Sequence, residues 1–290
     1  MTQPETSATR HRPAATVIVL RDTVAGPEAF MVRRHEASAF MGGAWVFPGG
    51  RVDPADAAGA DPSWCDGLDR SDLPSLSHGA AVAHRLAAIR ELFEEANVLL
   101  AREAGHVVST ADPAVHDRFA RYRHDLHAGV ITLKTLADRE RLRLALDALV
   151  PFARWMTPPV DTRQFDAWFF VTTVPPGQAP RADATETTDG AWLKPADALA
   201  RAAAGEITLP PPTWTTLREL ERFTTVGAAL EWAAARHIAP REPLLYERDG
   251  NTFLLLPGDP RNPQPWHEPL PPETRFRLVS GRWIPERAGV

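Results

Sequence analysis

The chain has 290 residues, of which 44% are hydrophobic and 24% charged, and these proportions are ordinary for a globular protein. Its formal net charge of −5 argues against a nucleic-acid backbone as the main partner. No run of residues approaches the roughly 20 apolar residues of a membrane span, and the polar N-terminus lacks the apolar core of a signal peptide. The single cysteine, Cys65, excludes an internal disulfide and fits a reducing compartment. We therefore expect a cytoplasmic protein with a sizeable core, and neither nucleic acid nor a membrane as partner.

Two strands are predicted near the N-terminus. Ala14–Leu20, A-A-T-V-I-V-L, is rich in β-branched residues and predicts a fully buried strand. Glu28–Arg33 follows a turn-rich segment and predicts its hairpin partner. Arg33 and Arg34 end this second strand and are candidates for contacts to a substrate phosphate. The alternative is that both arginines belong to a solvated strand end.

The next stretch combines a short strand with a glycine turn and a long loop. Phe40–Asp56, F-M-G-G-A-W-V-F-P-G-G-R-V-D-P-A-D, runs through apolar residues to Pro48 and then to Gly49 and Gly50. Glycines let the backbone approach a ligand closely, so this turn and the helix that follows resemble a cradle for phosphate and metal. Residues 57–77 then predict an ordered surface loop of unusual length. Its apolar residues, which we expect to pack against the domain, are Trp64 and Leu68.

The chain is organised around Leu86–Leu100, L-A-A-I-R-E-L-F-E-E-A-N-V-L-L. On a helix, Glu91, Glu94 and Glu95 share one face, and Arg90 precedes Glu94 by four residues and can brace it. Three like charges on one face repel each other unless a cation neutralises them, and oxygen ligands of this kind suit Mg²⁺ or Mn²⁺. The alternative is a solvated acidic face. The residues expected to face the core are Leu86, Ile89, Leu92, Phe93 and Ala96.

Caps and periodicity set the limits of this helix and predict two more helices. Ser77 is the expected N-cap, and Asn97 is expected to end the helix in a left-handed conformation. Apolar residues at three- and four-residue steps predict helices at 114–127 and 136–149. We place residues 101–150 as a mostly helical insertion and a candidate substrate lid whose leucines and Phe119 could line an apolar groove for a substrate arm. The alternative is that these side chains only bury the insertion.

The C-terminal half predicts strands, helices and a small β appendage. Expected strands are Phe152–Trp155, Asp166–Val174 and Ala191–Leu193, and expected helices are Asp197–Ala204, Thr213–Phe223 with Thr213 as its N-cap, and Val226–Arg236. From Pro240 onward short β runs alternate with turn residues. Asp249-Gly250 between two apolar runs predicts a hairpin, and 275–285 predicts another.

The glycine turn and the acidic helix together resemble the Nudix box of the Nudix hydrolases. The box positions are filled in order by Gly50, Asp56, Arg90, Glu91, Leu92, Glu94, Glu95, Asn97 and Val98. Asp56 stands where glutamate is usual, Asn97 replaces the closing glycine, and 33 residues (57–89) separate Asp56 from Arg90 instead of seven. The long insert is similar to a subgroup that resembles the peroxisomal coenzyme A diphosphatases. That subgroup is also matched by the stretches 40–50, 153–158, 163–170 and 209–213.

The resemblance implies specific roles for the acidic helix. Glu94 and Glu95 would bind Mg²⁺ or Mn²⁺, with the Gly49 carbonyl as a further ligand. Glu91 would be a ligand or the general base, and Arg90 would orient the glutamates. Asp56 is shorter than the glutamate that is usual at its position and is followed by the insertion, so its role is left open.

The resemblance also implies an acid on a later strand. The family places this acid six residues before a tryptophan, and Glu186 stands six before Trp192. Asp183 and Asp189 compete for this role, and all three residues could instead be ordinary loop acids. Independently of the resemblance, the strand end and the glycine turn give Arg33, Arg34 and Gly50 as the expected substrate contacts.

The predicted fold is an α/β (α+β) Nudix fold, a mixed β-sheet between helices. We expect a Nudix domain over 12–236, with insertions at 57–78 and 101–150, and a small β extension over 240–290. The implied activity is metal-dependent cleavage of a nucleoside diphosphate joined to another moiety, with coenzyme A or acyl-coenzyme A as the leading substrate. The alternatives are ADP-ribose or NADH as substrate, or a non-catalytic nucleotide-binding module. We leave a homodimer open.

Overall fold

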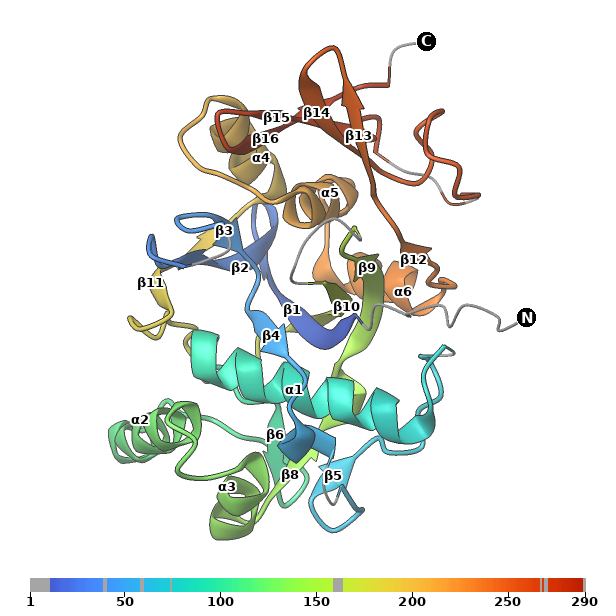
Figure 1. Ribbon diagram of the computed structural model, residues 1–290. Helices are drawn as coiled ribbons and strands as arrows, with labels where there is room; N and C mark the ends of the chain where they lie inside the picture. Colours follow the sequence, from blue (N-terminus) through green and yellow to red (C-terminus); the bar gives the residue numbers. More distant parts are fainter. Residues whose placement is uncertain are drawn as a thin grey trace, which may run out of the picture.

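A mixed eight-stranded sheet lies at the centre of the computed structural model, which describes residues 11–38, 41–57, 60–73, 75–158, 164–266, 268 and 271–288 (Figure 1). β1 (Arg12–Thr23) pairs in parallel with β10 (Phe165–Thr173) and antiparallel with β2 (Gly26–Arg34), so the predicted mixed sheet is confirmed. The strand order is β11-β2-β1-β10-β9-β12, with β3 on β2 and β4 on β1. The remaining bounds are β3 Trp45–Val46, β4 Gly49–Arg51, β9 Val150–Met156, β11 Thr187–Leu193 and β12 Pro240–Arg241.

Helices cover both faces of this sheet. In β1, Val17 and Val19 belong to one core cluster and Ile18 and Leu20 to the other, because successive side chains of a strand point to opposite faces. The first face packs against α1 (His78–Ala96). The second face packs against α4 (Pro195–Ala203), α5 (Pro211–Leu220) and α6 (Val226–Ala234). The run of β-branched residues in β1 is therefore buried on both sides, as predicted.

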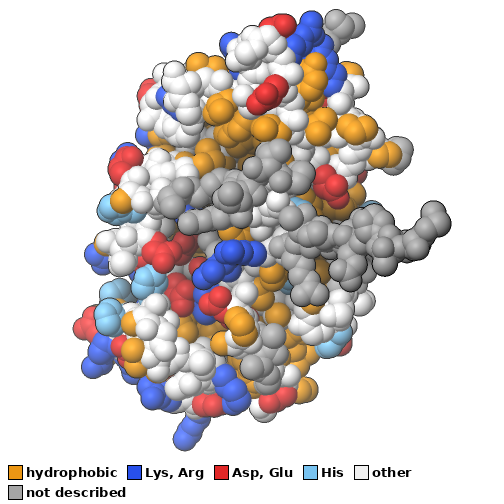
Figure 2. Space-filling model, in the orientation of Figure 1, with side chains coloured by type: hydrophobic (Ala, Val, Ile, Leu, Met, Phe, Trp, Pro, Cys, Tyr) orange, Lys and Arg blue, Asp and Glu red, His pale blue; other side chains and the backbone are white. Residues whose placement is uncertain are grey.

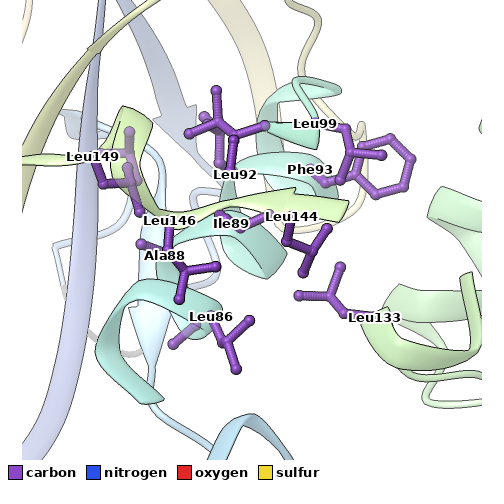
Figure 3. Close-up of a cluster of buried hydrophobic side chains, with 14 of the residues drawn as sticks. Leu86, Ala88, Ile89, Leu92, Phe93, Leu99, Leu133, Leu144, Leu146 and Leu149 are labelled. Atoms are coloured by element: carbon purple, nitrogen blue, oxygen red, sulfur yellow. The ribbon is translucent and has the colours of Figure 1, made fainter. Parts of the chain in front are cut away.

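The limits of α1 are those predicted from its caps. Ser77 accepts a hydrogen bond from the backbone N–H of Ala80, and Asn97 ends the helix in the left-handed region with φ 57°. Figure 3 shows Leu86, Ile89, Leu92 and Phe93 of α1 among the leucines of the neighbouring segments Leu142–Leu149 and α3. The apolar stripe of α1 thus anchors it, and its acidic face is left for the site.

The insertion is less helical than predicted. α2 (Pro113–His127) and α3 (Leu133–Glu140) are helices, but the helix expected at 136–149 is wrong beyond Glu140. Residues 142–145 form β8 instead, because Leu142 and Leu144 alternate with the half-buried Arg143 in the two-residue period of a strand. The remaining elements here are strands β5 (Cys65–Asp66), β6 (Ala101–Glu103) and β7 (His106–Val107), and short 3₁₀ turns at Pro54–Ala57 and Leu146–Ala148.

The two insertions join in one small sheet of order β5-β8-β6-β7. β5 comes from the 57–78 loop and pairs in parallel with β8 from the 101–150 segment. Asp66 of β5 forms ion pairs with Arg102 (3.1 Å) and Arg143 (2.6 Å). Trp64 is buried and Leu68 packs against the same core cluster, so the expectation that this loop packs down is confirmed.

The C-terminal segment forms a second four-stranded sheet, β13 (Leu244–Arg248), β14 (Asn251–Leu255), β15 (Arg275–Val279) and β16 (Arg282–Glu286). Both predicted hairpins are present, and Asp249 and Gly250 both have positive φ in the first turn. Leu254, Leu256 and Phe276 share the second core cluster with α4–α6. The division of the chain into a domain over 12–236 and an extension over 240–290 stays a prediction.

One predicted cap is wrong. α5 begins at Pro211 with Pro210 as its N-cap, so Thr213 lies inside the helix and is buried. Proline fits the first helical turn because that turn leaves its N–H groups unpaired, and this allows the N-cap to lie three residues earlier than predicted. Phe40 and Arg163, at the ends of two quoted stretches, lie outside the described residues. Within the described part of the chain, no helix is long and apolar enough to cross a membrane.

Candidate active site

The acidic face of α1 borders a large cleft. Glu91, Glu94 and Glu95 line it together with Gly49 and Gly50, and its volume is about 1350 Å³. Figure 2 shows acidic and basic side chains side by side in the middle of this face of the molecule, with hydrophobic side chains gathered above them. The sequence separates the glycine turn from the helix by a long loop, and the fold brings the two together.

The glycine turn touches the carboxylates directly. The backbone N–H of Gly49 donates a hydrogen bond of 2.8 Å to Oε2 of Glu95. A Cβ atom on Gly50 would lie 2.4 Å from Oε1 of Glu91, and one on Gly49 would lie 2.4 Å from the carbonyl oxygen of Ala15. No larger residue fits either position without displacing its neighbour, so the two glycines are required for this close approach.

Arg90 holds the acids in place. Its guanidinium donates to both carboxylate oxygens of Asp56, at 3.0 and 2.9 Å, and to the carbonyl oxygen of Arg51 at 2.8 Å. It also pairs with Glu91 at 2.9 Å and Glu94 at 3.1 Å. Burial opposes the charge, but the bonds to Asp56 and the nearby acids raise the pKa of Arg90 overall. Asp56, whose role the sequence left open, is therefore the anchor of this arginine.

The carboxylates of α1 are difficult to ionise together. Burial, assisted by the charge of Glu94 and opposed by that of Arg90, raises the pKa of Glu91 to about 7. Burial likewise raises the pKa of Glu94, and burial with the charge of Glu91 raises that of Glu95 well above its ordinary value. Three carboxylates this close together are all ionised at once only if a further cation binds beside them.

The carboxylates of α1 offer oxygen donors of the kind that a divalent cation needs. Among the described residues, no three His, Cys, Asp or Glu side chains are arranged so that they could hold a metal ion as they stand. Glu91 and Glu94 each turn one oxygen to Arg90, and Glu95 turns one to Gly49. The second oxygens, together with the surplus of negative charge, are the hard donors that Mg²⁺ and Mn²⁺ prefer, so these residues fit such an ion.

Of the three acids considered near β11, Glu186 is the one that lines the cleft. It lies directly before β11 and contributes to the raised pKa of all three helical glutamates. Asp183 instead accepts hydrogen bonds from the backbone N–H groups of Thr185, Glu186 and Thr187 and so holds the loop. Asp189 accepts one from the N–H of Gly190.

Of the two arginines predicted to contact substrate, only Arg34 lies at the cleft. Arg34 lines the cleft, and its charge acts on Glu95. Arg33 is not among the cleft residues and pairs with Glu36 on the surface. Neighbouring residues of a strand point to opposite faces, so only one of the two reaches the site.

One residue of the insertion contacts the site although the sequence did not predict it. Arg123 of α2 donates hydrogen bonds to the carbonyl oxygens of Glu94, at 2.8 Å, and Arg181, at 3.0 Å. Burial lowers its pKa to about 10 although nearby acids oppose the change. It ties α2 both to the end of α1 and to the loop that leads to Glu186. No motif marks it, because its partners are backbone atoms.

The expected apolar lining of the insertion is only partly present. Phe119 is buried in the core against Phe93, with ring centroids 6.4 Å apart, so its predicted place in a groove is wrong. Leu126, Ile131 and Leu133 do line the cleft.

Comparison with known proteins identifies relatives over most of the chain. Residues 69–222, more than half of the chain, match the family model described as the NUDT19 Nudix domain. Acyl-coenzyme A diphosphatase NUDT19 of Xenopus laevis is 26% identical over 274 residues, which cover 82% of this chain and 72% of that protein. The Homo sapiens protein of the same name is 28% identical over 297 residues, covering 89% and 76%. The crystal structure of a NUDIX hydrolase from Alicyclobacillus acidocaldarius has a TM-score of 0.65 and 28% identity, covering 78% of this chain and 97% of that one.

Proposed function

The chain belongs to the Nudix hydrolases, in the family described as the NUDT19 Nudix domain, and from this premise we propose that it cleaves the diphosphate of coenzyme A or an acyl-coenzyme A. The products would be 3′,5′-ADP and a phosphopantetheine or its acyl derivative. The observation that carries the proposal is the acidic face of α1 at the Gly49-Gly50 turn, inside a cleft large enough for a substrate of this size. The names of the relatives supply the substrate.

Glu94 and Glu95, with the carbonyl of Gly49, would hold the divalent cation, which we propose to be Mg²⁺ or Mn²⁺. When bound, such a cation neutralises charge on the diphosphate and makes a water molecule more acidic. Glu186 is the further acid available to it. These assignments follow the family pattern and the lining of the cleft.

Glu91 is the proposed general base. Arg90 engages its Oε1 atom, which leaves Oε2 to accept a proton from the attacking water. A pKa of about 7 places this carboxylate near the point where a base works best at neutral pH. Arg90 fixes the orientation of Glu91 and Glu94, and Arg34 faces the cleft where a phosphate oxygen would lie.

The alternative substrates are ADP-ribose and NADH, which present the same diphosphate to the same acids. A non-catalytic nucleotide-binding module is disfavoured, because this chain keeps the full acidic trio and its arginine. As finer parts of the proposal we place the enzyme in the cytoplasm, in line with its buried, unpaired Cys65, and we leave homodimerisation open.

The test is a cleavage assay with coenzyme A, octanoyl-coenzyme A, ADP-ribose and NADH, each with Mg²⁺, with Mn²⁺ and with EDTA. Formation of 3′,5′-ADP or AMP is followed by chromatography. The proposal predicts metal-dependent cleavage with the highest kcat/KM for a coenzyme A substrate. A higher kcat/KM for ADP-ribose or NADH would contradict the substrate, and no cleavage of any of the four would contradict the function.

A further inference from the structure

The cleft continues well beyond the acidic face of α1. Across the central sheet, Gly49 of β4 pairs with Thr16 of β1, and Thr16 pairs with Phe169 of β10. These three residues form a row across neighbouring strands, and each of them lines the cleft. At about 4.8 Å per strand, Phe169 lies roughly 10 Å from the glycine turn. The cleft therefore extends from the acids along this row of the sheet as far as Phe169.

Two small side chains lie in the floor of the cleft, between the pairs Arg12–Phe165 and Thr16–Phe169. Ala14 of β1 pairs with Ala167 of β10, and both line the cleft. Larger residues at these two positions would fill the space above the sheet. The two alanines thus keep a channel open between the acids and the far side of the cleft.

The C-terminal sheet forms the far wall of the channel. Leu245 of β13, Leu254 of β14 and Trp283 of β16 line the cleft and belong to, or pack against, the same core cluster as Phe169 and Ala167. The residues that β9, β10, α5 and the C-terminal sheet contribute to the lining are all uncharged. Figure 2 shows hydrophobic side chains gathered in this region, above the charged centre of the face.

The opposite end of the cleft has a different character. There the insertion contributes His127 and Lys134 beside Leu126 and Ile131, and Arg51 lies near the glycine turn. Cationic and polar side chains of this kind suit a phosphorylated nucleotide better than an alkyl chain. An acyl-coenzyme A has one end of each type, joined by the diphosphate.

We propose that the channel over Ala14 and Ala167, walled by Leu245 and Trp283 of the C-terminal sheet, binds the acyl arm of the substrate and sets its preferred chain length. The inference rests on the proposed function, because the diphosphate of the substrate must lie at α1 for the arm to reach this wall. It assigns the C-terminal sheet a part in substrate choice, and the insertion the nucleotide end.

The experiment compares kcat/KM for coenzyme A and its acetyl, octanoyl and lauroyl esters, in wild type and variants. Each methylene that leaves water for an apolar wall strengthens binding up to about fourfold, so octanoyl-coenzyme A should exceed acetyl-coenzyme A by about tenfold or more. Leu245→Glu should abolish this ratio. The matched control is Leu244→Glu on the same strand, because Leu244 is 37% exposed and does not line the cleft, and this variant should keep the ratio.

A second variant guards against a folding defect of Leu245→Glu. Ala167→Leu fills the floor of the channel and should shift the preference toward shorter chains, with the melting temperature checked for both variants. Binding of the same esters in EDTA, measured by calorimetry, should show the same order of affinities without any cleavage.

Three results would overturn the inference. Equal kcat/KM for acetyl and octanoyl esters in wild type would show that no apolar wall meets the arm. An equal loss of the octanoyl-to-acetyl ratio of kcat/KM in Leu244→Glu and Leu245→Glu would show that the substitutions disturb the C-terminal sheet in general and not an acyl site. Loss of the chain-length preference in Ile131→Glu, but not in Leu245→Glu, would place the arm against the insertion instead. If coenzyme A itself is not cleaved but the binding order holds, the proposed function fails and the acyl site stands.

Discussion

Two of the regions in which the molecule buries charged side chains differ in their balance of charge. On one side of the sheet, Arg241 of β12 and Glu219 of α5 are 1% and 4% exposed and form two hydrogen bonds, at 2.6 and 3.1 Å. Arg236 approaches the same glutamate and pairs with Glu268 at 2.7 Å. Two arginines therefore face two glutamates. On the other side, Asp56, Glu91, Glu94 and the more exposed Asp53 all pair with the guanidinium of Arg90, and Glu95 adds a fifth carboxylate beside them.

The difference distinguishes a structural ion pair from a site. A balanced pair neutralises itself and joins α5 to the edge strand β12. Burial, together with the surplus of acid, raises the pKa of Glu91, Glu94 and Glu95, and their unengaged oxygen atoms are left for another cation. The balanced pair should therefore control stability, and the surplus of acid should control activity.

Breaking the balanced pair should have the largest effect on stability. Arg241→Met leaves Glu219 buried with only the more distant Arg236, at 3.9 Å, and we expect a loss of about 3–5 kcal/mol in the free energy of unfolding. Urea denaturation measures it. Arg201→Met is the matched control, because Arg201 and Glu206 are well exposed, and it should cost less than about 1 kcal/mol. Similar losses in both variants would refute a special role for the buried pair.

Removing one acid of the surplus should reduce activity rather than stability. Glu94→Gln and Glu95→Gln should each lower kcat by about 100-fold or more, since each loses a cation ligand. Their melting temperatures in EDTA should stay the same or rise, because repulsion among the carboxylates decreases. The exposed Glu231→Gln provides the control in both assays. Wild-type turnover by both site variants would mean that the metal assignment is wrong.

Loosening α2 from α1 should have an intermediate effect. Arg123→Ala removes two charge-assisted hydrogen bonds to backbone carbonyls and should cost about 1–3 kcal/mol of stability. Because one of those carbonyls belongs to Glu94, the affinity for Mn²⁺ should fall several-fold as well. Arg121→Ala, at an exposed position of the same helix, should change neither quantity. A stability loss without any change in metal affinity would limit Arg123 to a packing role.

The smallest effect concerns pH. The pKa of Glu91 is raised from 4.5 to about 7 in the folded state, so folding favours the protonated form. Its contribution to stability is complete below pH 4.5 and is lost as the pH rises through about 7. In EDTA the melting temperature should therefore fall over this window, and less so in Glu91→Gln. An identical slope in the two proteins would exclude Glu91 as its source.

Local signals made much of α1 and the central sheet predictable. Ser77 and Asn97 are caps whose chemistry acts within a few residues, and β1 is marked by its β-branched run. The same reasoning failed at Leu142–Ala145, where leucines fit both a helical and a two-residue period and the pairing with β5 and β6 decided the outcome. A local sequence pattern does not reveal pairing with a strand that lies far away in the chain.

The site shows the same limit. The acidic trio was visible because its members are three and four residues apart. The role of Asp56 was not, since 33 residues (57–89) separate it from Arg90. Strand alternation predicts that Arg33 and Arg34 point to opposite faces of the sheet. It does not predict which of the two faces the cleft. The sequence predicted the C-terminal sheet only as a small β appendage. Its contribution to the lining of the cleft depends on tertiary contacts that no local pattern indicates.

The most direct test of the surplus-acid account is a calorimetric titration of Mn²⁺ into the metal-free protein at about pH 6 and about pH 8. The account predicts saturable binding that is tighter at the higher pH, with proton release at the lower one, because the cation displaces protons from carboxylates of raised pKa. The Glu94→Gln/Glu95→Gln double variant should lose this binding. Absence of saturable binding in wild type, or unchanged binding in the double variant, would contradict the assignment of α1 as a metal site.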